Sequence, residues 1–175
     1  DFDADKTEKG PEMFRFGMQM QMPERFNHIE YHGRGPVENY ADRKSSEFIG
    51  TYEADVKDEY YEYIRPQESG NHTDIRTFSV VDKTTGEGLT FYGDAPMECS
   101  ALNYLVEDLD DGMHKDKKWG HHSGDLVPRK LTQVHVQKRQ MGLACVNSWG
   151  AWPLKPYRLP YGDYNFKFAI KAYKR

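Results

Sequence analysis

Hydrophobic and polar residues alternate over several stretches of this chain. Between Met13 and Met22 every second residue is hydrophobic, and this set comprises Phe14, Phe16, Met18, Met20 and Met22. A repeat of two predicts a β-strand with one buried side. The same alternation predicts strands at Leu131–Val136 and over residues 164–172.

Shorter patterns add further strands and a single helix. Strands are predicted at Asn27–Tyr31 and Phe48–Val56, and a hairpin is predicted to join Asp74–Asp82 to Gly88–Tyr92. The Gly- and Pro-rich stretch Gly33–Pro36 is predicted to interrupt regular structure. Helical spacing predicts one short helix near residues 98–109, from the positions of Leu102, Leu105, Val106 and Leu109.

Together these elements predict an all-β fold, an antiparallel β-sandwich. Residues 1–12 are polar and are predicted to be a frayed lead-in to one unit over residues 13–175. Leu, Ile, Val and Phe supply only 32 of 175 residues, whereas aromatic residues reach 14%. Because aromatic burial can build a core where aliphatic side chains are scarce, we expect a modest aromatic core in an incomplete sandwich.

The overall charge and hydropathy exclude several classes of protein. The net charge is −4, and no long basic stretch occurs, which argues against a nucleic-acid partner. No apolar run is long enough for a membrane span, and no signal peptide is visible at the N-terminus. We therefore expect a soluble protein of the cytoplasm or periplasm, with oligomer formation left open.

The residues that could carry chemistry give few strong signals. His121 and His122 are adjacent, so on a strand they point to opposite faces, and His28 and His32 lack the helical setting that their spacing needs for a metal. The sequence therefore predicts no metal site, and Cys99 and Cys145 are expected to be free thiols. No nucleophile elbow or phosphate-binding loop is present.

Two charged clusters and one aromatic cluster remain. Glu38, Asp42 and Arg43 flank Tyr40 in one predicted loop, where charge-assisted hydrogen bonds can hold an irregular backbone. Arg65 and Glu68 lie in a second turn region and are interpreted in the same way. Trp149 and Trp152 lie in a Gly- and Pro-rich loop, where an indole can either plug the core or offer an apolar platform to a sugar ring.

Three ordered motifs resemble the C-terminal domain of the large β-galactosidases of glycoside hydrolase family 2. Residues Gly33–Arg43 resemble its G-x-G-P-x-E-N-Y-x-D-R signature, which includes Glu38, Asn39, Tyr40, Asp42 and Arg43. Residues Arg65–Asn71 resemble its P-Q/S-E-N-G-N signature, and Gln140–Gly150 resemble its M-G-x-G-G-D-D/N-S-W signature. The third motif departs from the family at Ala144-Cys145-Val146, where G-G-D is usual.

The resemblance implies a fold and a role. It implies the C-terminal portion of an antiparallel supersandwich similar to the galactose mutarotase fold, within a longer chain that hydrolyses β-galactosides. The catalytic glutamates and the Mg²⁺ and Na⁺ of such enzymes belong to a barrel outside this chain, so no catalytic residue and no cofactor is expected here. Trp149 matches the family tryptophan that contacts the sugar, and the remaining domains of the parent chain are the expected partners.

Two alternatives stay open at this point. A free-standing carbohydrate-binding sandwich would use Trp149 and Trp152 without a catalytic partner. A mutarotase-like epimerase would need a glutamate and a histidine that converge on one concave face, and His28, His32 and His72 are candidates by residue type.

Overall fold

The computed structural model describes residues 1–5, 10–64, 66–109, 122–144, 146–147 and 150–174. Seven antiparallel strands form one sheet within these ranges, in the order β1-β6-β5-β4-β2-β3, with β7 paired to β5. The strands are β1 (Arg15–Pro23), β2 (His28–Gly35), β3 (Phe48–Asp55), β4 (His72–Asp82), β5 (Glu87–Leu102), β6 (Leu131–Gln140) and β7 (Phe168–Lys174). The predicted antiparallel all-β fold is confirmed.

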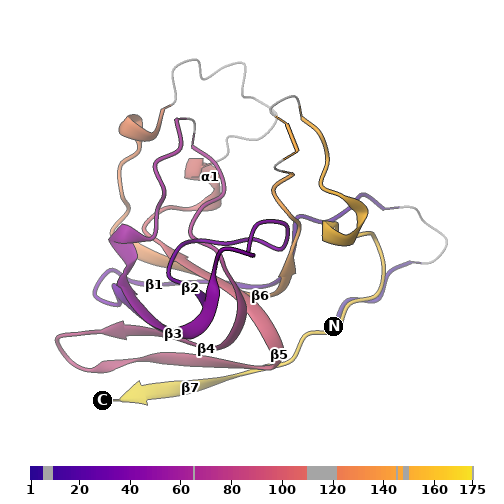
Figure 1. Cartoon of the computed structure of the whole chain (residues 1–175). Helices are drawn as coiled ribbons and strands as arrows, with labels where there is room; N and C mark the ends of the chain where they lie inside the picture. The colour runs from indigo at the N-terminus through magenta and orange to yellow at the C-terminus, as the bar shows by residue number, and fades with distance from the viewer. Residues whose placement is uncertain (6–9, 65, 110–121, 145, 148–149, 175) are drawn as a thin grey trace.

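Helical structure is confined to short segments among the described residues. These are the helix α1 (Val106–Leu109) and the 3₁₀ turns Val56–Asp58, Ser123–Asp125 and Lys155–Tyr157. Most of these segments and the long connections lie on one side of the strands, at the top of Figure 1. The strands therefore provide a floor beneath a layer of loops.

One face of the sheet carries the hydrophobic core. A row of aromatic side chains crosses three strands, because Tyr31 is paired with Phe78 and Phe78 with Phe91. Alternate residues of a strand point to the same face, and on this face Ile29, Phe78, Val80, Phe91 and Val136 are fully buried. The expected aromatic core is present, although aliphatic side chains contribute much of it.

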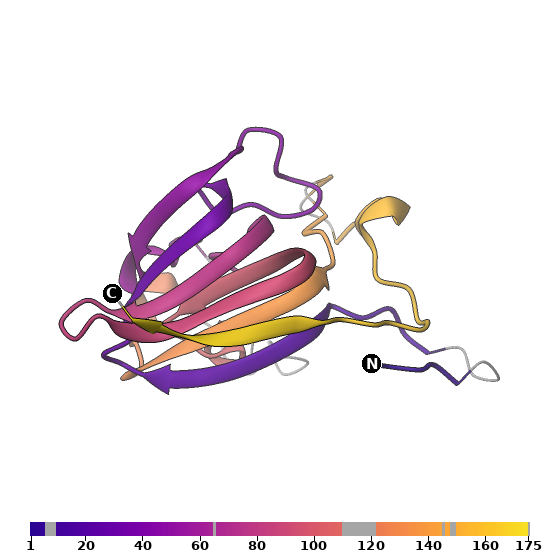
Figure 2. The same cartoon turned by 90° about the horizontal axis from the view of Figure 1, so that it is seen from below.

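A single sheet can bury this face because it is strongly curved (Figure 2). Met20 and Met22 of β1 border the same groove as Leu89 of β5 and Ala172 of β7. The two halves of the sheet thus approach one another, although β1 and β7 do not pair. Gly93 and Pro96 lie in β5 where its partner changes from β7 to β6, which is the position where a central strand tolerates them.

The structure corrects two local predictions. Residues 97–102 belong to strand β5 and not to the predicted helix, which is limited to α1. Met97, Cys99 and Ala101 alternate into the core between β4 and β6, so strand pairing on both sides overrides the helical spacing of the leucines.

The second correction concerns the glycines of the first motif. Strand β2 continues through Gly33 to Gly35 without interruption. A Cβ at Gly33 would lie 2.3 Å from Ile75 Cδ1, and one at Gly35 would lie 2.3 Å from the Tyr31 hydroxyl. These glycines therefore do not interrupt the strand. They permit close packing inside it, which is a common reason for glycine in a strand.

Part of the predicted lead-in is tied to the other end of the chain. Phe2 and Tyr164 exchange two backbone hydrogen bonds of 2.7 and 2.8 Å. The Ala4 amide also donates to Asp163 Oδ1 at 2.8 Å. These contacts bring the N-terminal residues beside the segment that leads into β7.

Candidate functional site

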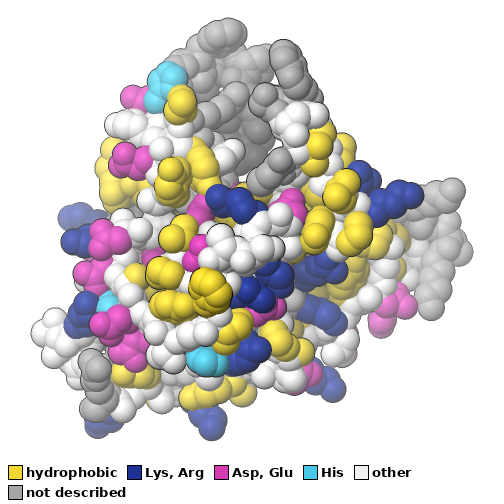
Figure 3. All heavy atoms as spheres, viewed as in Figure 1, with side chains coloured by type: hydrophobic (Ala, Val, Ile, Leu, Met, Phe, Trp, Pro, Cys, Tyr) yellow, Lys and Arg dark blue, Asp and Glu magenta, His cyan; other side chains and the backbone are white. Residues whose placement is uncertain are grey.

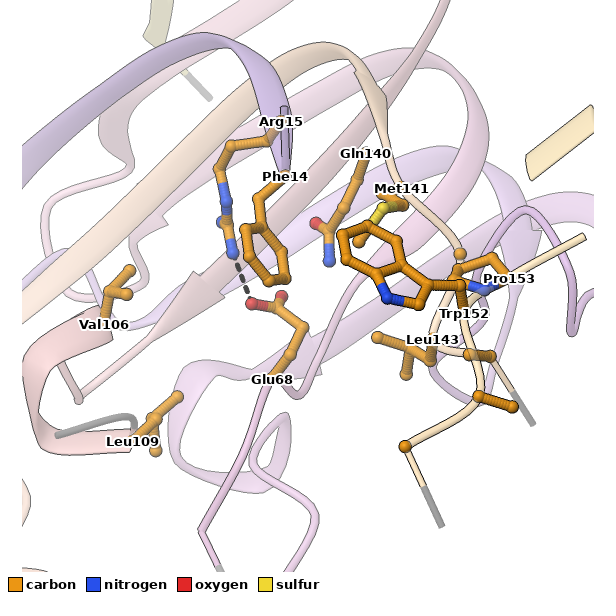
Figure 4. Close-up of a pocket in the computed structure, with 14 residues that line it drawn as sticks. Phe14, Arg15, Glu68, Val106, Leu109, Gln140, Met141, Leu143, Trp152 and Pro153 are labelled. Carbon is orange, nitrogen blue, oxygen red and sulfur yellow. Dashed lines mark hydrogen bonds and ion pairs between the residues drawn. The ribbon is translucent and has the colours of Figure 1, made fainter. Parts of the chain in front are cut away.

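A cavity of about 430 Å³ opens between the start of β1, helix α1 and the loop after β6 (Figure 4). Four separate parts of the chain build its wall. The lining residues are Phe14, Arg15, Glu68, Val106, Leu109, Gln140, Met141, Gly142, Leu143, Ala144, Gly150, Ala151, Trp152 and Pro153. The wall is mostly apolar, and its charged side chains are those of Arg15 and Glu68.

Arg15 connects the cavity to a buried histidine below it. Its guanidinium forms an ion pair with Glu68 and also lies 3.3 Å from Nδ1 of His135 on β6. Because a guanidinium can only donate, Nδ1 is the acceptor and Nε2–H donates to Gln19 Oε1 at 3.3 Å. Burial and the charge of Arg15 lower the pKa of His135 to about 3, so this imidazole is neutral at physiological pH.

Glu98 of β5 lies in the same buried polar layer. Its Oε2 accepts hydrogen bonds from the Gln140 amide at 3.2 Å and from Asn71 Nδ2 at 3.4 Å. Burial nevertheless raises the pKa of Glu98 to about 7. The carboxyl group is therefore close to half protonated at neutral pH.

Several buried side-chain amide atoms have no hydrogen-bond partner within the described part of the chain. They are both polar atoms of the Gln133 side chain, Oε1 of Gln137 and Oδ1 of Asn71. Buried polar atoms of this kind are usually satisfied by ordered water. The layer under the loops is thus polar and suited to hydration, unlike the apolar core on the opposite face.

The loop that carries the first motif joins two other loops beside this layer. Glu38 accepts hydrogen bonds from Arg43 Nη2 and the Gly70 amide, each at 2.6 Å, and from the Tyr63 hydroxyl. Burial and the carboxylate of Glu38 raise the pKa of Tyr63 to about 12. This single carboxylate therefore links three segments of the chain.

Asn39 and Asp42 extend the same network. The Asn39 Oδ1 accepts from the amide and hydroxyl of Thr73 at 3.0 and 2.6 Å. Asp42 accepts from the amides of Leu143 and Ala144 at 3.1 and 2.9 Å, and both of these residues line the cavity. Tyr40 is fully buried between these contacts.

The structure brings most of the predicted site residues into one region. Glu38, Asn39, Tyr40, Asp42 and Arg43 share one loop, and Glu68 contributes directly to the cavity. Arg65 and Trp149 lie outside the described residues. Trp152 is 56% exposed and lines the cavity, with the guanidinium carbon of Arg158 5.5 Å from the centre of its indole ring.

Sequence reasoning missed Arg15, Glu98 and His135. Arg15 was visible only as one polar position of an alternating strand, and Glu98 was hidden in the stretch assigned to a helix. Strand alternation at Leu131–Val136 could have shown that His135 faces away from the core side chains Val134 and Val136.

The three histidines considered for an epimerase do not line the cavity. His72 Nε2 lies 2.6 Å from Glu59 Oε2, but both side chains are buried. His32 Nδ1 lies 3.3 Å from Thr51 Oγ1, and His28 Nδ1 lies 2.8 Å from Asp55 Oδ1. A glutamate and a histidine do converge at His72, but inside the protein and not on an open concave face.

The described wall of the cavity is mostly apolar and carries a few polar side chains. Retaining hydrolysis needs two carboxyl groups about 5 Å apart. Among the described lining residues only Glu68 carries a carboxylate, and Arg15 neutralises it. Apolar and aromatic walls with a few polar groups suit a small ligand that presents both hydroxyls and C–H faces.

Among the described residues, no helix is both long and apolar enough to cross a bilayer. On the face seen in Figure 3, hydrophobic side chains lie among both acidic and basic ones.

Comparisons with known proteins find relatives of this chain. The family described as "Beta galactosidase small chain" matches residues 1–170. A β-galactosidase of Halalkalibacterium halodurans is 32% identical over 81% of the chain, and one of Priestia megaterium is 33% identical over 83%. A β-galactosidase of Streptococcus thermophilus is 30% identical over 92% of the chain. The chain spans only 13–15% of the length of these relatives.

Proposed function

Because the chain belongs to the β-galactosidase small chain family, we propose that it is the C-terminal β-sandwich part of a β-galactosidase. In this proposal the parent enzyme hydrolyses terminal β-galactosides with retention, through a covalent glycosyl-enzyme. Its catalytic carboxylates, and the Mg²⁺ and Na⁺ that the family uses, belong to a barrel outside this chain. The chain walls the active-site cleft and provides an aromatic contact for the sugar through Trp149.

The position of the cavity is the observation that supports this role. Gly150, the residue after Trp149, lines the cavity together with Ala151, Trp152 and Pro153. Asp42 holds the preceding residues Leu143 and Ala144 by their amides. Described residues on either side of Trp149 in the sequence, Ala144 and Gly150, therefore line the same mostly apolar cavity.

The free-standing carbohydrate-binding sandwich remains the second candidate. It is favoured by one specific observation, the exposure of Trp152 at the cavity rim. In that case Trp152 would share sugar binding with Trp149. In the β-galactosidase proposal Trp149 is the main contact.

Substitution of the two tryptophans separates the candidates. In a β-galactosidase polypeptide that contains this chain, Trp149→Ala should raise KM by roughly tenfold or more, because one large apolar contact contributes about 1–3 kcal/mol. The value of kcat should change little, since an indole offers no proton and no nucleophile. Steady-state kinetics with a chromogenic β-galactoside measure both values.

Trp152→Ala is the matched control, because it removes an indole from the same loop. It should leave KM within about twofold of the parent value under the first proposal. Galactose binding by the isolated chain that is weakened equally by Trp149→Ala and Trp152→Ala would favour the carbohydrate-binding alternative. Unchanged KM and kcat for Trp149→Ala would mean that this indole only packs beneath the loop.

A further inference from the structure

Three side chains with metal-ligating atoms meet on the polar face of β2 and β3. His28 and Glu30 are two residues apart on β2 and therefore point to the same side. Glu53 on β3 is paired directly with Glu30. The ligating atoms of His28, Glu30 and Glu53 all lie within 4.8 Å of one another.

The two glutamates form a cross-strand pair of like charge. Like charges placed directly opposite each other destabilise a sheet. Within the described ranges no Lys or Arg forms a salt bridge with Glu30 or Glu53. The Tyr173 hydroxyl lies 3.2 and 3.1 Å from the two oxygens of Glu30, and the His28 ring lies near Glu53.

The imidazole of His28 is held with one nitrogen toward these carboxylates. Its side chain is only 4% exposed, and Nδ1 lies 2.8 Å from Asp55 Oδ1. Asp55 Oδ1 also accepts a hydrogen bond from Lys83 Nζ at 2.8 Å, so it serves as the acceptor for the hydrogen on His28 Nδ1. Nε2 lies 3.7 Å from Glu53 Oε2, which is too long for a hydrogen bond.

This arrangement has the features of a metal-binding histidine. In such sites one ring nitrogen donates to a carboxylate, which fixes the tautomer and directs the other nitrogen to the ion. Here Asp55 takes the first role, and Nε2 faces the side on which Glu53 and Glu30 lie. The Tyr173 hydroxyl restrains Glu30 in the same outer shell.

We propose that His28, Glu30 and Glu53 form a binding site for one divalent transition-metal ion, best matched by Zn²⁺. One imidazole and two carboxylates are ligands that Zn²⁺ accepts, with a position left for water. Mg²⁺ prefers oxygen ligands in octahedral geometry, so a site with a histidine disfavours it. The ion joins β2 to β3, the strand at the margin of the sheet.

Sequence patterns did not indicate this site. The four-residue spacing of His28 and His32 suits a metal site only on a helix, and Glu53 lies on another strand. Only the pairing of β2 with β3 brings the third ligand opposite Glu30.

Zinc titration of the chelator-treated chain tests the proposal by calorimetry. One equivalent of Zn²⁺ should bind, and Mg²⁺ at the same concentration should not compete. Glu53→Gln removes one ligand from an exposed position and should weaken Zn²⁺ binding by at least roughly tenfold. Asp55→Asn should weaken it by roughly 10–100-fold, as is usual for the partner of a ligating histidine.

Glu62→Gln is the matched control, because it neutralises an exposed glutamate outside the cluster. It should bind Zn²⁺ as the parent chain does. Equal binding by Glu53→Gln and the parent would overturn the proposal and assign the ion to other histidines, such as His114, His121 and His122.

Nuclear magnetic resonance of the imidazole nitrogens provides a second readout. Zn²⁺ should shift the Nε2 signal of His28 and leave Nδ1 protonated. A His28 ring that stays unchanged at saturating Zn²⁺, in a folded chain, would also overturn the proposal. This test concerns residues remote from the cavity lining and does not depend on β-galactosidase activity.

Discussion

At the scale of single residues, the titration of Glu98 should be visible in the pH dependence of stability. Its pKa is about 7 in the folded chain because of burial, compared with 4.5 for the ordinary side chain. The folded state therefore holds its proton more tightly than the unfolded state does. The stabilising contribution is complete below about pH 4.5 and is lost as the pH rises through about 7.

Glu98→Gln removes this titration and keeps an oxygen acceptor for the Gln140 amide. We expect the variant and the parent to have similar free energies of unfolding near pH 4, with the variant gaining up to about 3 kcal/mol by pH 8. Chemical denaturation across this range measures the difference in the free energy of unfolding between the two proteins. His135 is present in both, so its own titration cancels in that difference. Glu62→Gln should show no such trend, and a constant difference for Glu98→Gln would contradict the assignment.

Residue types alone could not have revealed these environments. The motif residues Glu38, Asn39 and Asp42 were recognisable because they are close together in sequence. Arg15, Glu98 and His135 come from three different strands, so only the pairing of β1, β5 and β6 brings them together. Burial, which sets the pKa of both Glu98 and His135, is likewise a property of the assembled sheet.

At the scale of elements, period-two patterns predicted the strands well, and the helical spacing near residues 98–109 was misleading. The alternation of Met97, Cys99 and Ala101 was present in the same stretch as the helical signal. Neighbouring strands on both sides decided between the two patterns. The C-terminal end of β2 was missed for a related reason. Its glycines leave room for the side chains of Ile75 and Tyr31 and do not mark a turn.

The loop of residues 38–43 should behave as a clamp on the loop that follows β6. Asp42→Ala leaves the amides of Leu143 and Ala144 without their acceptor, so we expect a loss of about 1–3 kcal/mol in the free energy of unfolding. Asp42→Asn keeps one acceptor oxygen and should lose less. Urea denaturation of the chain measures both.

Asp58→Ala serves as the control for this clamp, because Asp58 is exposed and should change stability by less than about 0.5 kcal/mol. In a β-galactosidase polypeptide that contains this chain, Asp42→Ala should also raise KM, since the clamped loop borders the cavity. A large loss of turnover at unchanged stability would instead assign Asp42 a direct part in the reaction.

At the scale of the whole molecule, curvature explains how one described sheet buries a core. The thin aliphatic composition predicted a modest core, and the described strands form a single curved sheet. The sequence pattern contained the strands but not their curvature, because curvature depends on which strands lie beside one another. The partner of β5, for example, changes from β7 to β6 near Gly93 and Pro96.

The isolated chain should bind at its cavity but hydrolyse no β-galactoside. Among the described residues of the cavity wall, Glu68 carries the one carboxylate, and Arg15 holds it in an ion pair. Retaining hydrolysis needs two carboxyl groups, one as nucleophile and one as proton donor, and this wall does not supply both. We expect no release of chromophore from a chromogenic β-galactoside above that of the heat-treated chain. If turnover does appear, Glu68→Gln locates it: abolished turnover would make Glu68 a catalytic residue and contradict the assignment of the chemistry to a barrel outside this chain.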